Sequence, residues 1–251
     1  MKTGIYLSYI GLGANLLHLS YCHQVAKKYG PVTIITLCKN LEAALADDPL
    51  VEKVFYIDQY HKKLTDIFNL AKILKSFNFK NLLIFYPSIR LYLSAKLAGI
   101  KNVSIYNIFK KKNLHLVRAA KKLTEDFLQI NNCPTETNFF VNNDKLKKVN
   151  KDFTNSKFKI VIGAGSSGPT TRWGSKNFSE LINQLNKSDD YFFFILCGPN
   201  EKQIENEIIS NLDKHNYISL SDKNIKELVP YLCASDMYVG NDSFGSHITS
   251  Q

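Results

Sequence analysis

A polar loop at 163–173, here the arginine loop, reads Gly-Ala-Gly-Ser-Ser-Gly-Pro-Thr-Thr-Arg-Trp and follows an apolar run. It combines three glycines, four hydroxyl side chains (Ser166, Ser167, Thr170 and Thr171) and the cation of Arg172. Backbone N–H groups and hydroxyls donate to phosphate oxygens, and an arginine can hold them with two parallel bonds. The loop lacks the Gly-Lys-Ser/Thr ending of a P-loop. We expect an anion site here that includes Gly163; the alternative is a long loop around a packed tryptophan.

A second polar loop at 240–247, here the histidine loop, reads Gly-Asn-Asp-Ser-Phe-Gly-Ser-His after another apolar run. Asp242 and Ser243 occupy the place of a helix N-cap. Ser243, Ser246 and the free N–H groups beside them are able to bind a phosphate, and His247 is able to donate to it. Simple capping explains the same residues equally well. A weaker turn at 198–201, Gly-Pro-Asn-Glu, follows a third apolar run.

The opening loop, residues 11–15, reads Gly-Leu-Gly-Ala-Asn between an apolar run and a helical stretch. Its glycines allow a ligand to approach the backbone, although a simple tight turn fits as well. It is not a dinucleotide fingerprint, because Leu16 occupies the place of the third glycine and no acidic residue ends the second strand. No metal-ligand spacing, HExxH motif or Ser-His-Asp arrangement occurs in the chain, so we expect no metal site.

The first half of the chain alternates short apolar runs with helical stretches. The pattern predicts strands at 4–9, 32–37, 54–57, 81–85 and 103–106. It predicts helices at 16–29, 65–77, 89–98 and 114–128. Such alternation is typical of βαβ units and a mostly parallel sheet. The polar segment 129–157 breaks the rhythm and is expected to connect two domains, with one short strand at 139–141.

The alternation restarts in the second half, with strands predicted at 158–162, 191–196 and 237–239 and helices at 178–185, 203–212 and 225–233. We therefore expect an α/β protein with two Rossmann-like domains, residues 1–150 and 151–251. The three polar loops follow predicted strands, at the edge where open α/β sheets bind ligands. Residues 246–251 have the pattern of an opening helical turn, after which a parallel sheet normally continues. The second domain is thus expected to be incomplete, in a C-terminally truncated chain.

Composition narrows the class of protein further. No run of about 18 apolar residues and no secretory signal occurs. The five cysteines show no CxxC pair, which favours a reducing cytoplasm.

Residues 1–150 carry a net charge of +12 and residues 151–251 a net charge of −2. The first half is therefore expected to meet an anionic partner, unless the lysines only reflect AT-rich coding sequence. No nucleic-acid-binding motif is present, and no nucleic-acid partner is expected.

In order along the chain, these loops resemble those of the heptosyltransferase-like glycosyltransferases, family 9, which include the ADP-heptose:lipopolysaccharide heptosyltransferases. The arginine loop with Phe178 is similar to a family loop that ends in a basic residue and Trp. Residues 197–201, Cys-Gly-Pro-Asn-Glu, are similar to the family's Gly-Gly-x-x-Glu turn. The histidine loop resembles its Gly-Asn-Asp-Ser/Thr…His donor motif, which is the most specific of the matches. Residues 11–17 resemble the family's opening loop.

The resemblance implies a GT-B architecture and an inverting, metal-independent transfer of a sugar, expected to be heptose. The donor would be a nucleotide diphospho-sugar such as ADP-heptose, with no other cofactor. The acceptor would be an anionic lipid-linked saccharide of the lipopolysaccharide-core type. The enzyme would be cytoplasmic, with peripheral contact at the inner-membrane face. Epimerases of the same architecture are disfavoured, because the first half shows no cluster of paired carboxylates and histidines.

The resemblance also implies roles for individual residues. Gly11 and Gly13 would lie on the acceptor side. The remaining residues would bind the donor: Gly163, Ser166, Ser167, Thr170, Thr171, Arg172, Gly198, Glu201, Asp242, Ser243, Gly245, Ser246 and His247. The family's presumed general base is an aspartate that corresponds to Ala14, with Asn15 as the weak remaining candidate. The alternative function is therefore a homologue that binds the donor but transfers sugar poorly. A second departure is that the donor-motif glycine falls at Gly245 instead of Phe244.

Overall fold

The computed structural model of the chain describes residues 2–58, 63–109, 115–152, 157–166, 172–187, 190–198, 200–210 and 212–250. The chain divides into two α/β units, Met1–Asn138 and Phe139–Gln251. Each unit contains a parallel sheet with helices on its faces, which confirms the predicted pair of Rossmann-like folds. Among the described residues, no helix is both long and apolar enough to cross a bilayer.

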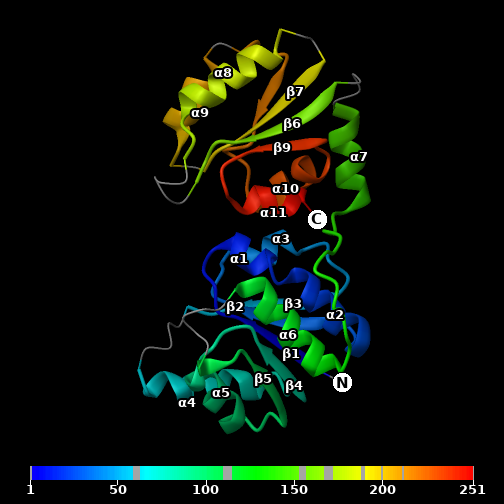
Figure 1. Cartoon of the computed structure of the whole chain (residues 1–251), viewed down its shortest axis with the longest axis vertical. Coiled ribbons are helices and arrows are strands. Elements are labelled where there is room, and N and C mark those ends of the chain that lie inside the picture. The colour runs from blue at the N-terminus through cyan, green and yellow to red at the C-terminus, as the bar shows by residue number, and fades with distance from the viewer. Residues whose placement is uncertain are drawn as a thin grey trace. The chain divides into compact units, whose positions relative to one another are not determined.

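The sheet of the first unit has the strand order β3-β2-β1-β4-β5 (Figure 1). Its strands are β1 (Thr3–Leu7), β2 (Val32–Thr36), β3 (Val51–Tyr56), β4 (Asn81–Ile84) and β5 (Asn102–Ile105). Its helices are α1 (Leu12–Leu16), α2 (Leu19–Tyr29), α3 (Leu41–Ala44), α4 (Thr65–Ser76), α5 (Ile89–Leu97) and α6 (Leu116–Leu128). Strands β1, β2 and β4 are buried along their whole length, as expected for inner strands of a parallel sheet.

The helix predicted at 16–29 is α2, which begins only at Leu19, and most of the opening loop expected at 11–15 is a separate short helix, α1. The His18 backbone N–H donates to the Asn15 carbonyl at 3.0 Å, a three-residue spacing that tightens the chain and ends α1. Helix α2 then begins at Leu19 and ends at Gly30, whose φ of 89° stops it. The break between the two helices therefore lies at residues 17–18, directly after α1, which holds most of the opening loop.

The sheet of the second unit has the order β8-β7-β6-β9. Its strands are β6 (Phe158–Gly163), β7 (Tyr191–Leu196), β8 (Tyr217–Ser219) and β9 (Met237–Gly240). Its helices are α7 (Asn143–Asp152), α8 (Ser175–Leu185), α9 (Lys202–Ile209), α10 (Ile225–Cys233) and α11 (Phe244–Thr249). Side chains alternate across the sheet. Ile162 and Phe193 join the core under α8 and α9, while Phe194 contacts Tyr231 of α10 on the other face (Figure 1).

Helix α7 occupies much of the segment expected to be an irregular connection. The Asn142 side-chain oxygen accepts from the backbone N–H of Asp144 at 2.8 Å and so supports the first turn. The short strand predicted at 139–141 was wrong, because these residues are irregular and lead into α7. Helix α7 packs against α10. The units therefore divide at residues 138 and 139, whereas the expected boundary at 150 lies inside α7.

Candidate functional site

Three polar loops of the second unit start from neighbouring points of one sheet. In the strand register, Gly163 at the end of β6 pairs with Leu196 of β7 on one side and with Gly240 of β9 on the other. The arginine loop, the turn at 198–201 and the histidine loop therefore begin together at the carboxyl edge. This is the edge at which open α/β sheets bind ligands.

Glu201 joins the arginine loop to the turn at 198–201. Its Oε2 accepts from the Gly198 N–H at 2.7 Å, and its Oε1 accepts from the Ser166 N–H at 3.2 Å. Oε1 also accepts from Arg172 Nη2 at 2.8 Å. The same Arg172 nitrogen donates to the Ser166 carbonyl at 3.0 Å. The carboxylate thus holds two amides and one guanidinium, and a charge-assisted bond of this kind is stronger than a neutral one.

Asn241 joins the arginine loop to the histidine loop. Its side-chain Nδ2 donates to the Ala164 carbonyl at 2.7 Å, and its Oδ1 accepts from the backbone N–H of Trp173 at 2.9 Å. Its own N–H donates to the Gly163 carbonyl at 2.8 Å. The residue is buried, so its amide group lies inside the site as a structural link between two loops.

Tyr238, on strand β9, supports the histidine loop through its hydroxyl group. Its hydroxyl lies 3.0 Å from the Asn241 carbonyl and 2.9 Å from Ser243 Oγ. The phenol has one hydrogen, so when it serves the carbonyl the Ser243 hydroxyl donates to the phenol oxygen. Burial raises the pKa of Tyr238 and keeps it neutral. A methyl group at Gly163 would overlap the Tyr238 ring, and one at Gly245 would lie 3.0 Å from it, so both glycines make room for this tyrosine.

The side chains of the histidine loop differ in their exposure and in the hydrogen bonds that they already form within the protein. The Ser246 hydroxyl donates to the Ser243 carbonyl at 2.7 Å and must rotate to serve a ligand. Asp242 is largely exposed, with its Oδ1 3.8 Å from His247 Nε2. His247 is partly buried, with 23% of its side chain exposed. Asp242 is therefore the side chain of this loop most accessible to a ligand.

The structure brings together the described members of the predicted donor set at one sheet edge: Gly163, Ser166, Arg172, Gly198, Glu201, Asp242, Ser243, Gly245, Ser246 and His247. Ser167, Thr170 and Thr171 lie outside the described residues. Glu201 and Ser166 serve mainly to build the loops, since their described bonds are internal. The predicted set omitted Asn241 and Tyr238. Both lie in or beside the histidine loop, but a local pattern does not show which distant backbone groups they reach.

The opening loop belongs to the first unit, and there Asn15 has a structural role. Its Nδ2 donates to the carbonyls of Gly11 at 2.7 Å and Tyr9 at 3.0 Å, and its Oδ1 accepts from Thr36 Oγ1 at 2.9 Å. The side chain is buried. A buried amide with these three bonds closes the loop and is not available as a base, which corrects the expectation for Asn15. Gly11 is exposed, and Gly13 and Ala14 are partly exposed.

A buried histidine behind this loop was not predicted as part of the site. His18 Nδ1 lies 2.7 Å from the Ala14 carbonyl, and its Nε2 lies 2.8 Å from the Tyr106 hydroxyl. A carbonyl oxygen only accepts, so Nδ1 carries the hydrogen and Nε2 accepts from Tyr106. Burial lowers the pKa of His18 to about 4, and the ring stacks on Tyr9 with centroids 5.0 Å apart. His18 is thus a neutral support of the α1 turn.

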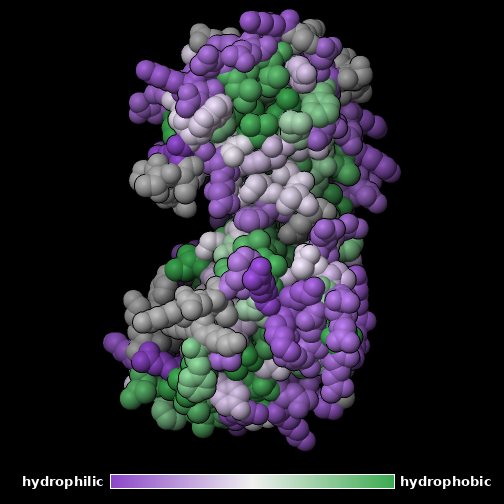
Figure 2. All heavy atoms as spheres, viewed as in Figure 1, coloured by the Kyte–Doolittle hydropathy of each residue, from purple (hydrophilic) through white to green (hydrophobic). Residues whose placement is uncertain are grey.

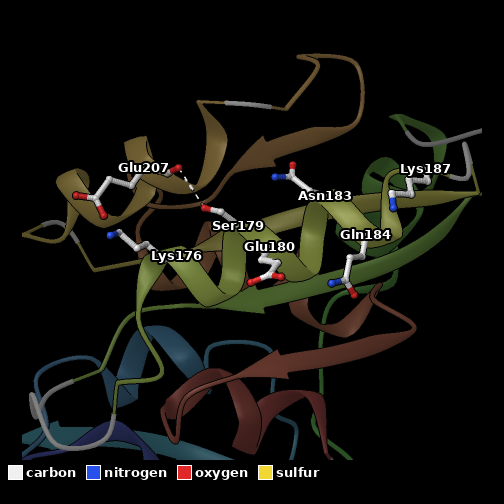
Figure 3. A pocket seen from close by; sticks show the side chains of 7 residues that line it. All are labelled: Lys176, Ser179, Glu180, Asn183, Gln184, Lys187 and Glu207. Carbon is white, nitrogen blue, oxygen red and sulfur yellow. Dashed lines mark hydrogen bonds between the residues drawn. The ribbon is translucent and has the colours of Figure 1, made fainter.

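A groove of about 580 Å³ runs along the outer side of α8. Figure 3 shows the lining side chains from Lys176 to Gln184 on this helix, Lys187 beyond its end, and Glu207 on the neighbouring helix α9 with its carboxylate on the side of Lys176. The lining residues are Lys176, Ser179, Glu180, Asn183, Gln184, Lys187 and Glu207. None of them belongs to the predicted donor set, so the groove is separate from the loops at the sheet edge. Within the described part of the chain, no group of three or more His, Cys, Asp or Glu is placed to hold a metal ion.

Two Rossmann-like units, the second with linked polar loops at its carboxyl edge, define a protein of the GT-B class. The sequence profile of glycosyltransferase family 9 (heptosyltransferase) matches residues 98–250. The chain belongs to this family and is a glycosyltransferase. The resemblance drawn from its loops is therefore confirmed. A comparison with curated protein sequences gives no match.

Solved structures support the same architecture. The chain is similar to E. coli ADP-heptose lipopolysaccharide heptosyltransferase II, with a TM-score of 0.76 and 16% identity, over 99% of this chain and 81% of that one. A family 9 glycosyl transferase from Veillonella parvula gives 0.75 and 13%, over 99% and 78%. The E. coli heptosyltransferase WaaC with ADP-2-deoxy-2-fluoro heptose gives 0.74 and 12%, over 99% and 85%. At such identities the likeness concerns the fold.

Proposed function

We propose that the chain is an inverting, metal-independent glycosyltransferase that moves heptose from ADP-heptose to an acceptor of the lipopolysaccharide-core type. The supporting observation is the linkage of three loops at one sheet edge by Glu201 and Asn241, which holds Arg172 beside the histidine loop. The printed names of two similar structures, an ADP-heptose heptosyltransferase and a complex with an ADP-heptose analogue, favour this donor.

The proposed reaction is a displacement at the anomeric carbon. The acceptor hydroxyl oxygen forms a bond to this carbon, the bond from the carbon to the diphosphate oxygen breaks, and the nucleoside diphosphate leaves with the bonding electrons. The hydroxyl proton passes to water, because the place of the family's presumed base is occupied by Ala14. Arg172 and His247 stabilise the charge on the departing diphosphate, Ser243 joins them when its hydroxyl turns away from Tyr238, and Asp242 contacts a sugar hydroxyl. Donors that are already positioned usually supply the largest part of such catalysis.

The arginine is prepared for this role before the donor arrives. Both hydrogen bonds of its guanidinium to described residues use Nη2. Among these residues, its Nη1 and Nε hydrogens have no hydrogen-bond acceptor. Glu201 fixes the direction of the side chain, of which 38% is exposed. An arginine held on one side and open on the other is suited to bind a diphosphate with two parallel bonds.

The acceptor is proposed to be an anionic lipid-linked saccharide bound by the first unit, at the cytoplasmic face of the inner membrane. The net charge of +12 over residues 1–150 supports an anionic acceptor. No cofactor or nucleic acid takes part in this proposal.

Isothermal calorimetry tests the donor site. We expect the wild type to bind ADP and ADP-heptose in preference to GDP- and UDP-sugars, and Arg172→Ala to bind ADP at least about tenfold more weakly, since bonds to charged groups contribute about 1.5–3 kcal/mol. Lys176→Ala, on the α8 groove, is the control and should bind as the wild type does. Absence of nucleotide binding in the wild type would contradict the proposal.

A second candidate function is donor binding with impaired transfer. It is favoured by Ala14 at the place of the family's presumed base and by the structural role of Asn15. Ala14 is partly exposed, so Ala14→Asp can place a carboxylate at this position. If the rest of the site is intact, sugar transfer in this variant should rise about 10²–10⁴-fold over the wild type. Rapid transfer by the wild type, unchanged in Ala14→Asp, would rule out this candidate.

A further inference from the structure

Helices α4 and α5 of the first unit expose large apolar side chains that the fold does not need. The exposed fractions are 73% for Leu64 and 62% for Phe68, beside and on α4, and 57% for Ile89, 44% for Leu93 and 57% for Leu97 on α5. We call these five residues the apolar face. Figure 2 shows apolar side chains gathered over α4 and α5, at the lower left of the view. Contiguous exposed apolar surface of this kind usually marks a contact site.

The spacing shows that these residues are additional to the core. Leu64 and Phe68 are four apart, and Ile89, Leu93 and Leu97 repeat every four residues, so each set forms a stripe along its helix. The opposite side of each helix already faces the core, through Leu70 and Leu74 on α4 and through Leu91 and Ala95 on α5. The two helices also pack on each other. Both are therefore apolar on a second, outward side.

The same segment carries the positive charge of the chain. Residues 62–112 hold 11 Lys and Arg and one acidic residue, Asp66, which is a net charge of +10 and equals the net charge of the whole chain. Lys72 and Lys75 continue the stripe of Phe68 along α4, and both are exposed. On α5, Lys96 lies next to Leu97, and its Nζ lies 5.6 Å from the Tyr92 ring centroid. The apolar face is thus accompanied by lysines on both helices.

We propose that the apolar face, with the lysines of α4 and α5, docks this chain on the surface of an anionic lipid bilayer. A bilayer provides both parts of the match, because acyl chains receive apolar side chains and anionic headgroups attract lysines. A second copy of the chain would bring the same lysines of α4 and α5 against these, and the like charges would repel. A nucleic acid would attract the lysines but would leave the apolar stripes in water.

The docking would bring the first unit to the surface that holds the acceptor. In that respect it rests on the proposed function, since it assumes a lipid-linked acceptor. The surface itself is argued only from exposure, spacing and charge. The binding mode is peripheral, with side chains reaching into the headgroup region from helices that lie along the surface.

Vesicle co-sedimentation tests the proposal on the full chain. The probes are phosphatidylcholine vesicles and vesicles with about 30% phosphatidylglycerol. A basic residue near an anionic leaflet raises partitioning about fivefold. We therefore expect at least about tenfold stronger binding to the anionic vesicles, reduced by salt. The double variant Phe68→Ser with Leu93→Ser should bind the anionic vesicles at least about tenfold more weakly than the wild type. The double variant Lys72→Glu with Lys75→Glu should show the same loss of binding. Lys176→Glu on α8 combined with Lys187→Glu just beyond its end makes the same change in charge and should bind like the wild type.

Each outcome decides the proposal separately from the enzyme function. Calorimetry with ADP and circular dichroism on every variant show whether the donor site and the fold remain. A wild type that binds ADP but not anionic vesicles overturns the docking proposal and leaves the enzyme function standing. Equal loss in the α8 control also overturns it, because charge alone would then explain the binding. A wild type that binds the vesicles through α4 and α5 but binds no nucleotide supports the docking surface and contradicts the enzyme function.

Discussion

Glu201 and Arg172, 29 residues apart, form an ion pair of 2.8 Å between Oε1 and Nη2 across two loops of the second unit. The carboxylate also receives the N–H groups of Gly198 and Ser166. Only 14% of the Glu201 side chain is exposed, so solvent screens the pair less on that side than at Arg172. The glutamate therefore holds the arginine in place and closes the turn that leads into α9.

The first prediction concerns Glu201→Ala. The substitution leaves two backbone N–H groups without their acceptor, and a buried unsatisfied donor costs about 1–3 kcal/mol. We expect the free energy of unfolding, measured with urea, to fall by about 2 kcal/mol, and ADP affinity to fall with it as Arg172 loses its partner. Glu180→Ala, on the exposed side of α8, is the control. Equal midpoints for the wild type and Glu201→Ala would contradict this role.

A second prediction concerns the contact between β6 and β9. A methyl group on Gly240 would lie 2.5 Å from the Gly163 carbonyl oxygen and 2.6 Å from its Cα. These are backbone atoms, so the strands themselves must move apart. Gly240→Ala should destabilise the protein by about 1–3 kcal/mol. Gly11→Ala should be close to neutral, because φ is −72° and nothing lies within 4 Å of the added methyl group. Thermal unfolding of the two variants gives the comparison.

The third prediction separates a structural Asn15 from a catalytic one. Asn15→Asp replaces two N–H donors by a carboxylate that faces the carbonyls of Tyr9 and Gly11. We expect a loss of about 3 kcal/mol or more and no gain in sugar transfer, because a buried charge without a partner is costly. Asn183→Asp, exposed on α8, is the matched control. A stable Asn15→Asp variant with faster transfer would show that Asn15 occupies the position of the base.

The fourth prediction is a pH dependence of stability that comes from His18. Burial lowers its pKa in the folded chain to about 4 from an ordinary value of 6.5, so the ring is neutral in both states above pH 6.5. Between pH 6.5 and 4 the unfolded chain takes up a proton that the folded chain rejects, and stability is lost as the pH falls. The full loss is about 3 kcal/mol. Urea unfolding of the wild type and of His18→Gln at pH 7 and pH 4.5 measures the contribution of His18. If the free energy of unfolding falls equally in both proteins, His18 does not cause the pH dependence.

Much of the fold could be predicted because strand and helix periods are local properties. The strands that were missed or misplaced had little local signal. Strand β8 has three residues, too few to show alternation. Helix α7 is polar along most of its length, and its visible sign was Asn142 at the start together with the apolar spacing of Leu146 and Val149, the latter buried.

The site could be predicted as a set of loops, since parallel strands direct their carboxyl ends to one edge. The bonds that connect the loops could not. Asn241 and its partner Ala164 are 77 residues apart, and Glu201 and Ser166 are 35 apart. Asn15 shows the reverse case. Its place in the chain suggested a catalytic base. Its hydrogen bond with Thr36, 21 residues away, holds the side chain inside the protein.

The only tryptophan of the chain, Trp173, stands at the junction of these loops. Its backbone N–H is bonded to Asn241, its ring meets Phe178 edge-on with centroids 4.9 Å apart, and about half of the residue is exposed, at 51%. Indole emission depends on how much water surrounds the ring. Fluorescence that is excited selectively in tryptophan therefore comes from one position, next to Arg172 in the chain. The unmodified protein thus carries its own optical signal for ligand binding at this sheet edge.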